Sequence, residues 1–166
     1  MANAKTSLVT NEDAQPVVFN HVGVNGARVR TIMATFTSQA SGSAGDTYVI
    51  AKLHPEWRIN HIWVTNEAAT STNVDIGLVS DSSATAISDA ATACYADNLT
   101  FASARTTAPA DAAFATRTID KIGQQVYQDA GHTEATKLNE YYLCVKAVAA
   151  LGNSKKVSIN VQFTTD

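Results

Sequence analysis

The sequence predicts an all-β protein folded as an antiparallel β-sandwich, and three observations support this prediction. Short runs rich in Val, Ile, Tyr and Phe recur along the chain with apolar residues at about every second position, the periodicity of a half-buried strand. Turn residues separate these runs at short intervals. One short segment alone, near residues 123–130, is typical of a helix. About eight such strands favour a jelly roll of two sheets, with an immunoglobulin-like sandwich as the alternative.

Four strands are expected in the first half of the domain, at residues 29–37, 47–53, 57–65 and 73–79. The stretch from Trp57 to Thr65 is apolar on both faces, which predicts a central strand of a sheet. Strict alternation along it places Trp57, Ile59 and Trp63 on one face. We therefore expect these three side chains to pack in the core.

The second half of the domain is less regular. The Ala, Ser, Thr and Asp segment at 80–92 predicts a surface excursion with room for a short helix. Residues 94–101 and 114–119 are weaker strand candidates, and the glycines of Gly123–Gly131 enclose the expected helix. Residues 141–149 and 156–163 alternate as strands, and the turn residues at 150–154 predict a hairpin between them.

Two parts of the chain are expected, an extended N-terminal arm at residues 1–27 and the sandwich domain at 28–166. The arm is polar, contains Pro16 and ends in the turn Gly23–Gly26. Its one apolar cluster is Val17, Val18 and Phe19, so we expect these residues to form the contact with a binding partner. The alternative is that they form a first strand of the sandwich.

Composition favours a protein partner over nucleic acid or membrane. The chain is 45% hydrophobic but only 16% charged, so its surface is expected to carry many small neutral side chains, which are weakly hydrated and easily desolvated. The net charge of −3 comes with no run of Lys or Arg that could follow a phosphate backbone, so no nucleic acid is expected. The longest apolar stretch, Leu143–Leu151, is short and interrupted by Lys146, and the first residues lack a secretory pattern; neither export nor a membrane partner is expected.

The sequence predicts no catalytic, cofactor-binding or metal site. No nucleophile elbow or phosphate-binding glycine pattern is present, and the four histidines are far apart. His132 with Glu134 is the nearest approach to a ligand pair, and Asp81 with Asp89 the nearest to a calcium site; solvated loop residues are the favoured interpretation of both.

The cysteines and the tryptophans have ordinary structural interpretations. Cys94 and Cys144 lie among apolar residues without a Cys-x-x-Cys pair, so two reduced thiols in the core are favoured over a disulfide. Both tryptophans precede both cysteines, which disfavours the immunoglobulin-like alternative. In the turn His54–Trp57, Trp57 is expected to anchor the next strand, and a sugar-stacking or partner-binding role is the alternative.

Several segments resemble a family of small bacteriophage virion proteins that decorate or cement the capsid. They are Gly26–Arg30, Gly45–Tyr48, Thr72–Leu78 and Gly123–Tyr127, together with the polar start of the chain. The resemblance extends through most of the chain and is one of layout, because none of these motifs is specific alone.

The resemblance implies a non-enzymatic structural protein that binds the outer surface of a phage capsid and stabilises it. It implies a β-sandwich or jelly-roll subunit without a cofactor, with the major capsid protein and further copies of itself, most simply in a homotrimer, as partners. Its expected location is the capsid surface of the virion, and the host cytoplasm before assembly. The alternatives are a head-fibre, head–tail joining or tail-fibre component, or a carbohydrate-binding module that uses Trp57, Trp63 and Tyr95.

Overall fold

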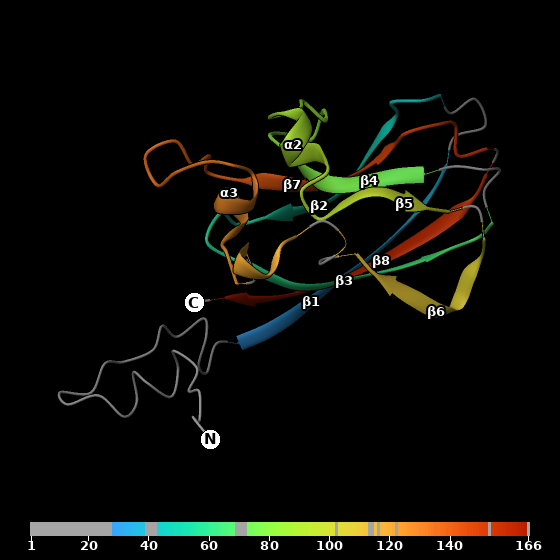
Figure 1. Cartoon of the computed structure of the whole chain (residues 1–166), viewed down its shortest axis with the longest axis horizontal. Helices are drawn as coiled ribbons and strands as arrows, with labels where there is room; N and C mark the ends of the chain where they lie inside the picture. The colour runs from blue at the N-terminus through green and yellow to red at the C-terminus, as the bar shows by residue number, and fades with distance from the viewer. Residues whose placement is uncertain are drawn as a thin grey trace, which may run out of the picture.

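The computed structural model describes residues 28–38, 43–68, 73–101, 103–112, 115, 117–121, 123–152 and 154–165. In this part of the chain, two antiparallel sheets pack face to face (Figure 1). The expected arm at residues 1–27, with Val17, Val18 and Phe19, lies outside the described residues.

The strands follow the order of a jelly roll. The first sheet has the order β1-β8-β3-β6 and the second the order β2-β7-β4-β5, so the chain crosses between the sheets at most of its connections. All neighbours in both sheets pair antiparallel. This arrangement confirms the predicted sandwich and its jelly-roll form. The strands are β1 (Arg28–Thr37), β2 (Thr47–Leu53), β3 (Arg58–Asn66), β4 (Asn73–Val79), β5 (Ala96–Thr100), β6 (Arg105–Asp111), β7 (Tyr141–Ala147) and β8 (Lys156–Thr165).

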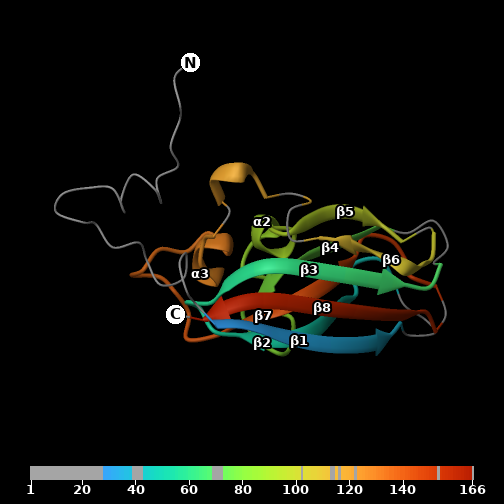
Figure 2. The ribbon, with the colours of Figure 1, turned by 90° about the horizontal axis from the view of Figure 1, so that it is seen from below.

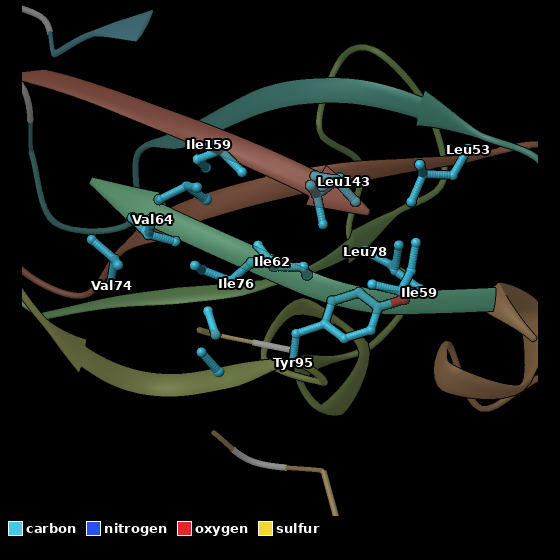
Figure 3. Close-up of a cluster of buried hydrophobic side chains, with 14 of the residues drawn as sticks. Leu53, Ile59, Ile62, Val64, Val74, Ile76, Leu78, Tyr95, Leu143 and Ile159 are labelled. Carbon is cyan, nitrogen blue, oxygen red and sulfur yellow. The ribbon is translucent and has the colours of Figure 1, made fainter. Parts of the chain in front are cut away.

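The core lies between the two sheets and is filled by their inward-facing side chains. Figure 3 shows aliphatic side chains of both sheets gathered between the strands, with the ring of Tyr95 at one margin of the cluster. Each of these side chains is almost completely removed from water, which at roughly 1.5 to 3 kcal/mol per large apolar residue is the main source of the stability of the fold. Ten of the residues in this view are Leu53, Ile59, Ile62, Val64, Val74, Ile76, Leu78, Tyr95, Leu143 and Ile159.

Strand β3 is central, as predicted, but it does not alternate as its sequence suggests. The pairing of β3 with β8 shifts register between Ile59 and His61, which marks a β-bulge at Asn60. A bulge adds one residue to one strand and so reverses which residues face inward beyond it. Ile59, Ile62 and Val64 are therefore buried, whereas Trp63 is half-buried on the outer face. The prediction that Trp63 packs in the core was wrong.

Trp57 lies just before β3 and acts as an anchor, as expected. It is half-buried and packs against the core, and its ring stacks on Phe163 of β8 with the ring centroids 4.2 Å apart. Pro55, in the turn before it, is buried and accepts a backbone hydrogen bond from Tyr127 through its carbonyl.

The sixth strand is displaced from its predicted position. β6 runs over Arg105–Asp111 and includes Pro109, whereas residues 117–118 belong to no strand and Ile119–Lys121 form a short 3₁₀ helix, η1. The predicted strand at 114–119 was therefore wrong for its described residues, and Phe114 lies outside them. β6 is at the edge of its sheet, where a proline can be accommodated because one side of the strand needs no ladder hydrogen bonds.

The link between β7 and β8 is a crossover, so the predicted hairpin at 150–154 was wrong. β7 pairs with β2 and β4, whereas β8 pairs with β1 and β3 in the other sheet. Leu151 is buried and holds the middle of this link. Ser38 fixes it further, because its hydroxyl donates to the Gly152 carbonyl at 2.9 Å and accepts from the Lys155 amide at 2.8 Å.

Two short helices lie beside the sandwich. The predicted helix is present as α3 (Val126–Asp129), and the chain leaves it through Gly131 at φ +81°. The expected excursion holds α2 (Asp89–Thr92), where the Ser88 hydroxyl accepts a hydrogen bond from the Ala91 amide. Helix α2 covers Gly77 of β4 so closely that any Cβ there would collide with the backbone of Ala91 and Thr92. No helix in the described part of the chain is long and apolar enough to cross a membrane.

Candidate interaction surface

Three of the four strands of the first sheet, β1, β8 and β3, carry no charged side chain along the middle of their outer face, although the exposed Lys156 lies on the same face at the start of β8. Because these strands pair in register, their outward side chains form three rows perpendicular to the strands. None of the nine side chains is that of Lys, Arg, Asp or Glu. The rows are Thr31–Gln162–His61, Met33–Asn160–Trp63 and Thr35–Ser158–Thr65.

No helix covers this face in the view of Figure 2, where β3, β8 and β1 lie side by side toward the viewer. Met33 is 74% exposed, and Val29 on the same face of β1 is 57% exposed. A large hydrophobic side chain left in water on the outside of a sheet forgoes the free energy of burial, and a patch of such residues is typical of a binding surface. We call the three rows together the neutral face.

A shallow groove lies over the middle row of the neutral face and extends to the row of Thr65 and Ser158. Its lining residues are Met33, Trp63, Thr65, Ser158 and Asn160, and its volume is about 350 Å³. The side-chain oxygen Oδ1 of Asn160, a residue of the middle row, is buried and has no hydrogen-bond partner among the described residues. A buried amide oxygen without a donor is energetically costly.

The indole ring of Trp63, which lines the groove, stacks on the imidazole ring of His61. The two rings stack with their centroids 4.8 Å apart and an interplanar angle of 9°. Nδ1 of His61 lies 2.5 Å from Oδ2 of Asp111 on the neighbouring strand β6, and the other oxygen of Asp111 accepts from the Ile62 amide at 3.2 Å. The position of the indole is therefore fixed by the sheet itself.

The outer face of the second sheet differs from the neutral face because it carries charged side chains. Its side chains include the ion pair of Lys52 with Glu140, and Glu140 also accepts a hydrogen bond from the Tyr142 hydroxyl at 2.8 Å. Asp75 accepts from the Asn98 amide at 3.0 Å, and α2 covers part of the same side. The two sheets thus present a charged, partly covered face and a neutral, open one.

A cleft of about 580 Å³ lies beside α2 and α3 and contains the most strongly buried charges of the described residues. Arg117 and Asp129 form a two-contact ion pair, with Nη2 to Oδ2 at 2.6 Å and Nε to Oδ1 at 3.2 Å, and their side chains are 1% and 2% exposed. Nη1 of Arg117 also donates to the Ile59 carbonyl, the guanidinium lies over the ring of Tyr95, and the Tyr95 hydroxyl donates to Asp129.

This network joins the loop before α3 and α3 itself to the sandwich. Burial raises the pKa of Asp129 above its usual range, although Arg117 and the Tyr95 hydroxyl oppose the rise. Burial also raises the pKa of the Tyr95 hydroxyl well above its ordinary value. Both oxygens of the Asp129 carboxylate accept hydrogen bonds from within the chain. The network therefore has a structural role, in which it holds α3 and the loop before it against the sandwich.

The weaker candidates from the sequence have local structural roles. His132 contacts the Tyr141 hydroxyl through Nδ1 at 2.6 Å, whereas Glu134 pairs with Lys137. Asp81 accepts from the amides of Ser83 and Thr85, which closes a turn, and Asp89 lies in the first turn of α2. Among the described residues, no three His, Cys, Asp or Glu side chains are grouped as a metal site would require.

The aromatic residues considered for carbohydrate binding do not converge. Tyr95 is fully buried in the core, Trp57 stacks on Phe163, and Trp63 stands on the neutral face. Of the three, only Trp63 lines a groove on the described surface. The sequence did not predict this position, because no residue pattern in it indicates the bulge at Asn60.

Both cysteines are free, as predicted. Burial raises the pKa of the Cys144 thiol to about 12 and also raises the pKa of Cys94 well above its usual value. Thiols with a raised pKa carry little thiolate at neutral pH, so both are expected to react slowly; Cys144 is buried, and Cys94 is half-buried against the core.

Comparison with known proteins finds similarity in structure but none in sequence families or curated proteins. No protein-family model matches this chain, and no curated protein matches it. A chain of the cyanophage Pam1 capsid asymmetric unit superposes with a TM-score of 0.54 at 13% identity, over 84% of this chain and 86% of that one. A chain from the capsid of Ralstonia phage GP4 gives a TM-score of 0.47 at 12% identity, over 84% and 85% of the two chains. At such identities, the likeness to the Pam1 chain shows that the fold is shared.

Proposed function

We propose that this chain is a non-enzymatic structural protein of a bacteriophage virion, which binds the outer surface of the capsid and stabilises it as a decoration or cement protein. The observation that carries the proposal is the jelly roll shared with a chain of the Pam1 capsid over 84% of this chain. A fold by itself hosts many functions. The neutral face adds an independent argument, because a weakly hydrated surface of this kind is suited to permanent contact with other proteins.

The proposed partners are the major capsid protein and further copies of this chain, with a homotrimer as the favoured state. Closed symmetric oligomers are the usual form of repeated subunits, and several linked copies attach to a shell more tightly than one. The proposed location is the capsid surface of the virion, and the host cytoplasm before assembly.

The proposed attachment point is the N-terminal arm, residues 1–27, with Val17, Val18 and Phe19 as its anchor. Burial of one Phe and two Val side chains contributes roughly 1.5 to 3 kcal/mol per side chain, which is enough for a contact repeated over several copies.

Co-sedimentation with shells that lack this protein tests the proposal. Full-length protein is expected to pellet with the shells, and a chain with Val17, Val18 and Phe19 all replaced by Ser is expected to remain in the supernatant with an unchanged melting temperature. A matched control replaces Asn11, Glu12 and Asp13 with Ala and is expected to bind like the unaltered protein. Failure of the full-length protein to bind any shell would contradict the proposed function, and equal binding by the two variants would contradict the proposed anchor.

A further inference from the structure

We infer that the groove beside Trp63 is a binding site for a neutral oligosaccharide, in which one sugar ring stacks on the indole and its hydroxyl groups bond to the side chains around it. This inference is separate from the attachment of the arm to a shell. The groove lies over the middle row of the neutral face and the row of Thr65 and Ser158, so the row of Gln162 is left for contacts with neighbouring proteins.

One face of the Trp63 indole is open to the groove. The ring of His61, two residues earlier on the same side of β3, covers the other face at an interplanar angle of 9°. Of these two neighbours in the described chain, Thr65, two residues later, lines the groove, whereas His61 does not. Side chains two residues apart on a strand lie about 6 to 7 Å apart, and threonine is much shorter than tryptophan, so the indole face stands free above Thr65. A flat ring therefore has room to lie against it.

The indole is held in position before a ligand binds. Nδ1 of His61 lies 2.5 Å from Oδ2 of Asp111, and the other oxygen of Asp111 accepts from the Ile62 amide, so the ring that supports Trp63 is bonded to the neighbouring strand β6. A surface whose side chains are already ordered loses less conformational entropy when a ligand covers it. This order favours stacking of a single sugar ring, which makes few contacts.

The lining of the groove disfavours charged ligands and favours hydroxyl groups. As far as the structure describes them, its residues are Met33, Trp63, Thr65, Ser158 and Asn160, none of which is acidic or basic. A nucleotide or another anion would find no counter-charge there, and an ammonium group would find no carboxylate. A wholly apolar ligand would leave the amide and the two hydroxyls without partners, which costs free energy.

Asn160 supplies an acceptor that has no partner in the described chain. Its Oδ1 is buried and makes no hydrogen bond there. Rotation about the last side-chain bond, which has a broad energy minimum, exchanges the positions of Oδ1 and Nδ2 and turns the oxygen toward the groove that the residue lines. A sugar hydroxyl then donates to this oxygen, and a second hydroxyl accepts from Nδ2.

A neutral sugar meets all of these requirements. A pyranose has a face of C–H bonds, whose slightly positive hydrogens are attracted to the negative face of an aromatic ring, and a rim of hydroxyls that donate and accept. The groove, at about 350 Å³, is near the lower end of the range for ligand sites, roughly 300 to 1,000 Å³. Beyond Thr65 and Ser158, a hollow of about 190 Å³ continues toward one acidic and one basic residue, Glu67 and Lys156, and gives room for a second ring.

Titration of the full-length, ¹⁵N-labelled protein with sugars tests the inference by nuclear magnetic resonance. The chain has two tryptophans, so the two indole N–H signals are separate probes: Trp63 lines the groove, and Trp57 stacks on Phe163. The neutral ligands are maltotriose, cellotriose and chitotriose, and the charged one is sialyllactose. At least one neutral trisaccharide is expected to shift the Trp63 signal to saturation while the Trp57 signal stays in place. No saturable shift with any of the three, or a shift with sialyllactose alone, would overturn the inference.

Two amide variants on β8 form a matched pair, measured by calorimetry with the sugar that responds. Asn160→Ala removes the acceptor in the groove and is expected to weaken binding by about tenfold, whereas Gln162→Ala removes an amide from the same face outside the groove and is expected to change it by less than about twofold. Equal binding by the two variants would contradict the site.

The indole itself is tested by Trp63→Phe and Trp63→Ala. The first variant assigns the indole signal by removing it and keeps a smaller ring, so it is expected to retain measurable binding, whereas the second is expected to bind no sugar. Sugar binding by Trp63→Ala at the strength of the unaltered protein would contradict the stacking. A Trp63 signal that shifts only when shells are added would also overturn the inference and would assign the groove to the shell.

Discussion

At the scale of single residues, the buried ion pair of Arg117 and Asp129 is sensitive to the loss of either partner. Both side chains are almost fully buried, and their hydrogen bonds reach β3 and Tyr95 as well as each other. Desolvation of two charges offsets much of their attraction, so the pair adds little net stability while it is intact. Its loss has a different cost, because the remaining partner becomes an unpaired charge in the interior.

Replacement of one partner is therefore expected to be strongly destabilising. Asp129→Asn leaves the Arg117 guanidinium without a counter-charge, and we expect the free energy of unfolding to fall by about 3 to 5 kcal/mol, measured by urea denaturation. Replacing Arg117 and Asp129 together is expected to cost less than the sum of the two single replacements. As the control, Lys52→Ala removes an exposed ion pair with Glu140 and is expected to leave the urea midpoint nearly unchanged. An Asp129→Asn variant as stable as the unaltered protein would refute the role of the pair.

At the scale of elements, β3 decides which side chains face the core and which face a partner. The bulge at Asn60 turns Ile62 and Val64 inward and leaves His61 and Trp63 outside. Strict alternation would place Trp63 in the core. Because the bulge adds one residue, Asn60, the Trp63 side chain instead lines the groove on the outer face.

Because of the bulge, we expect the stability of the protein to depend more on Ile62 than on the larger Trp63, which is the reverse of what strict alternation predicts. Ile62→Ala removes a fully buried side chain and is expected to lower the free energy of unfolding by about 2 to 5 kcal/mol. Trp63→Ala removes the larger but half-buried side chain and is expected to cost only about 1 to 2 kcal/mol. Urea denaturation of both variants gives the comparison. A larger loss for Trp63→Ala than for Ile62→Ala would mean that β3 alternates without a bulge.

The same elements show how far the sequence alone determines the fold. Seven of the eight strands and helix α3 were predicted within a few residues, because apolar alternation and glycine termination are local signals. The errors at β6 and at the β7–β8 link involve pairing between distant segments. Residues 150–154 have the composition of a hairpin, but β8 pairs with β1 and β3 of the other sheet, and the burial of Leu151 and the hydrogen bonds of Ser38 hold the link that leads there. The neutral face could not be predicted, because it requires the register of three strands that are distant in the sequence.

At the scale of the whole molecule, the jelly roll separates two kinds of surface. One sheet carries α2, and the strands β1, β8 and β3 of the other sheet have no helix over them (Figures 1 and 2). The outer face of the sheet that carries α2 includes the ion pair of Lys52 with Glu140, whereas the other sheet presents the neutral rows. A subunit of a large assembly needs such a division, because one side must remain hydrated while another is covered by a neighbour. The proposed virion role assigns the neutral face outside its groove and the N-terminal arm to contacts with other proteins.

An electron cryo-microscopy map of particles that bear this protein is the most direct test of the proposed role. The account predicts jelly-roll density on the outside of the capsid shell, attached to the major capsid protein, with copies in closed groups. Density for this chain in a head fibre, at the head–tail junction or in the tail, or particles from which the chain is absent, would contradict it.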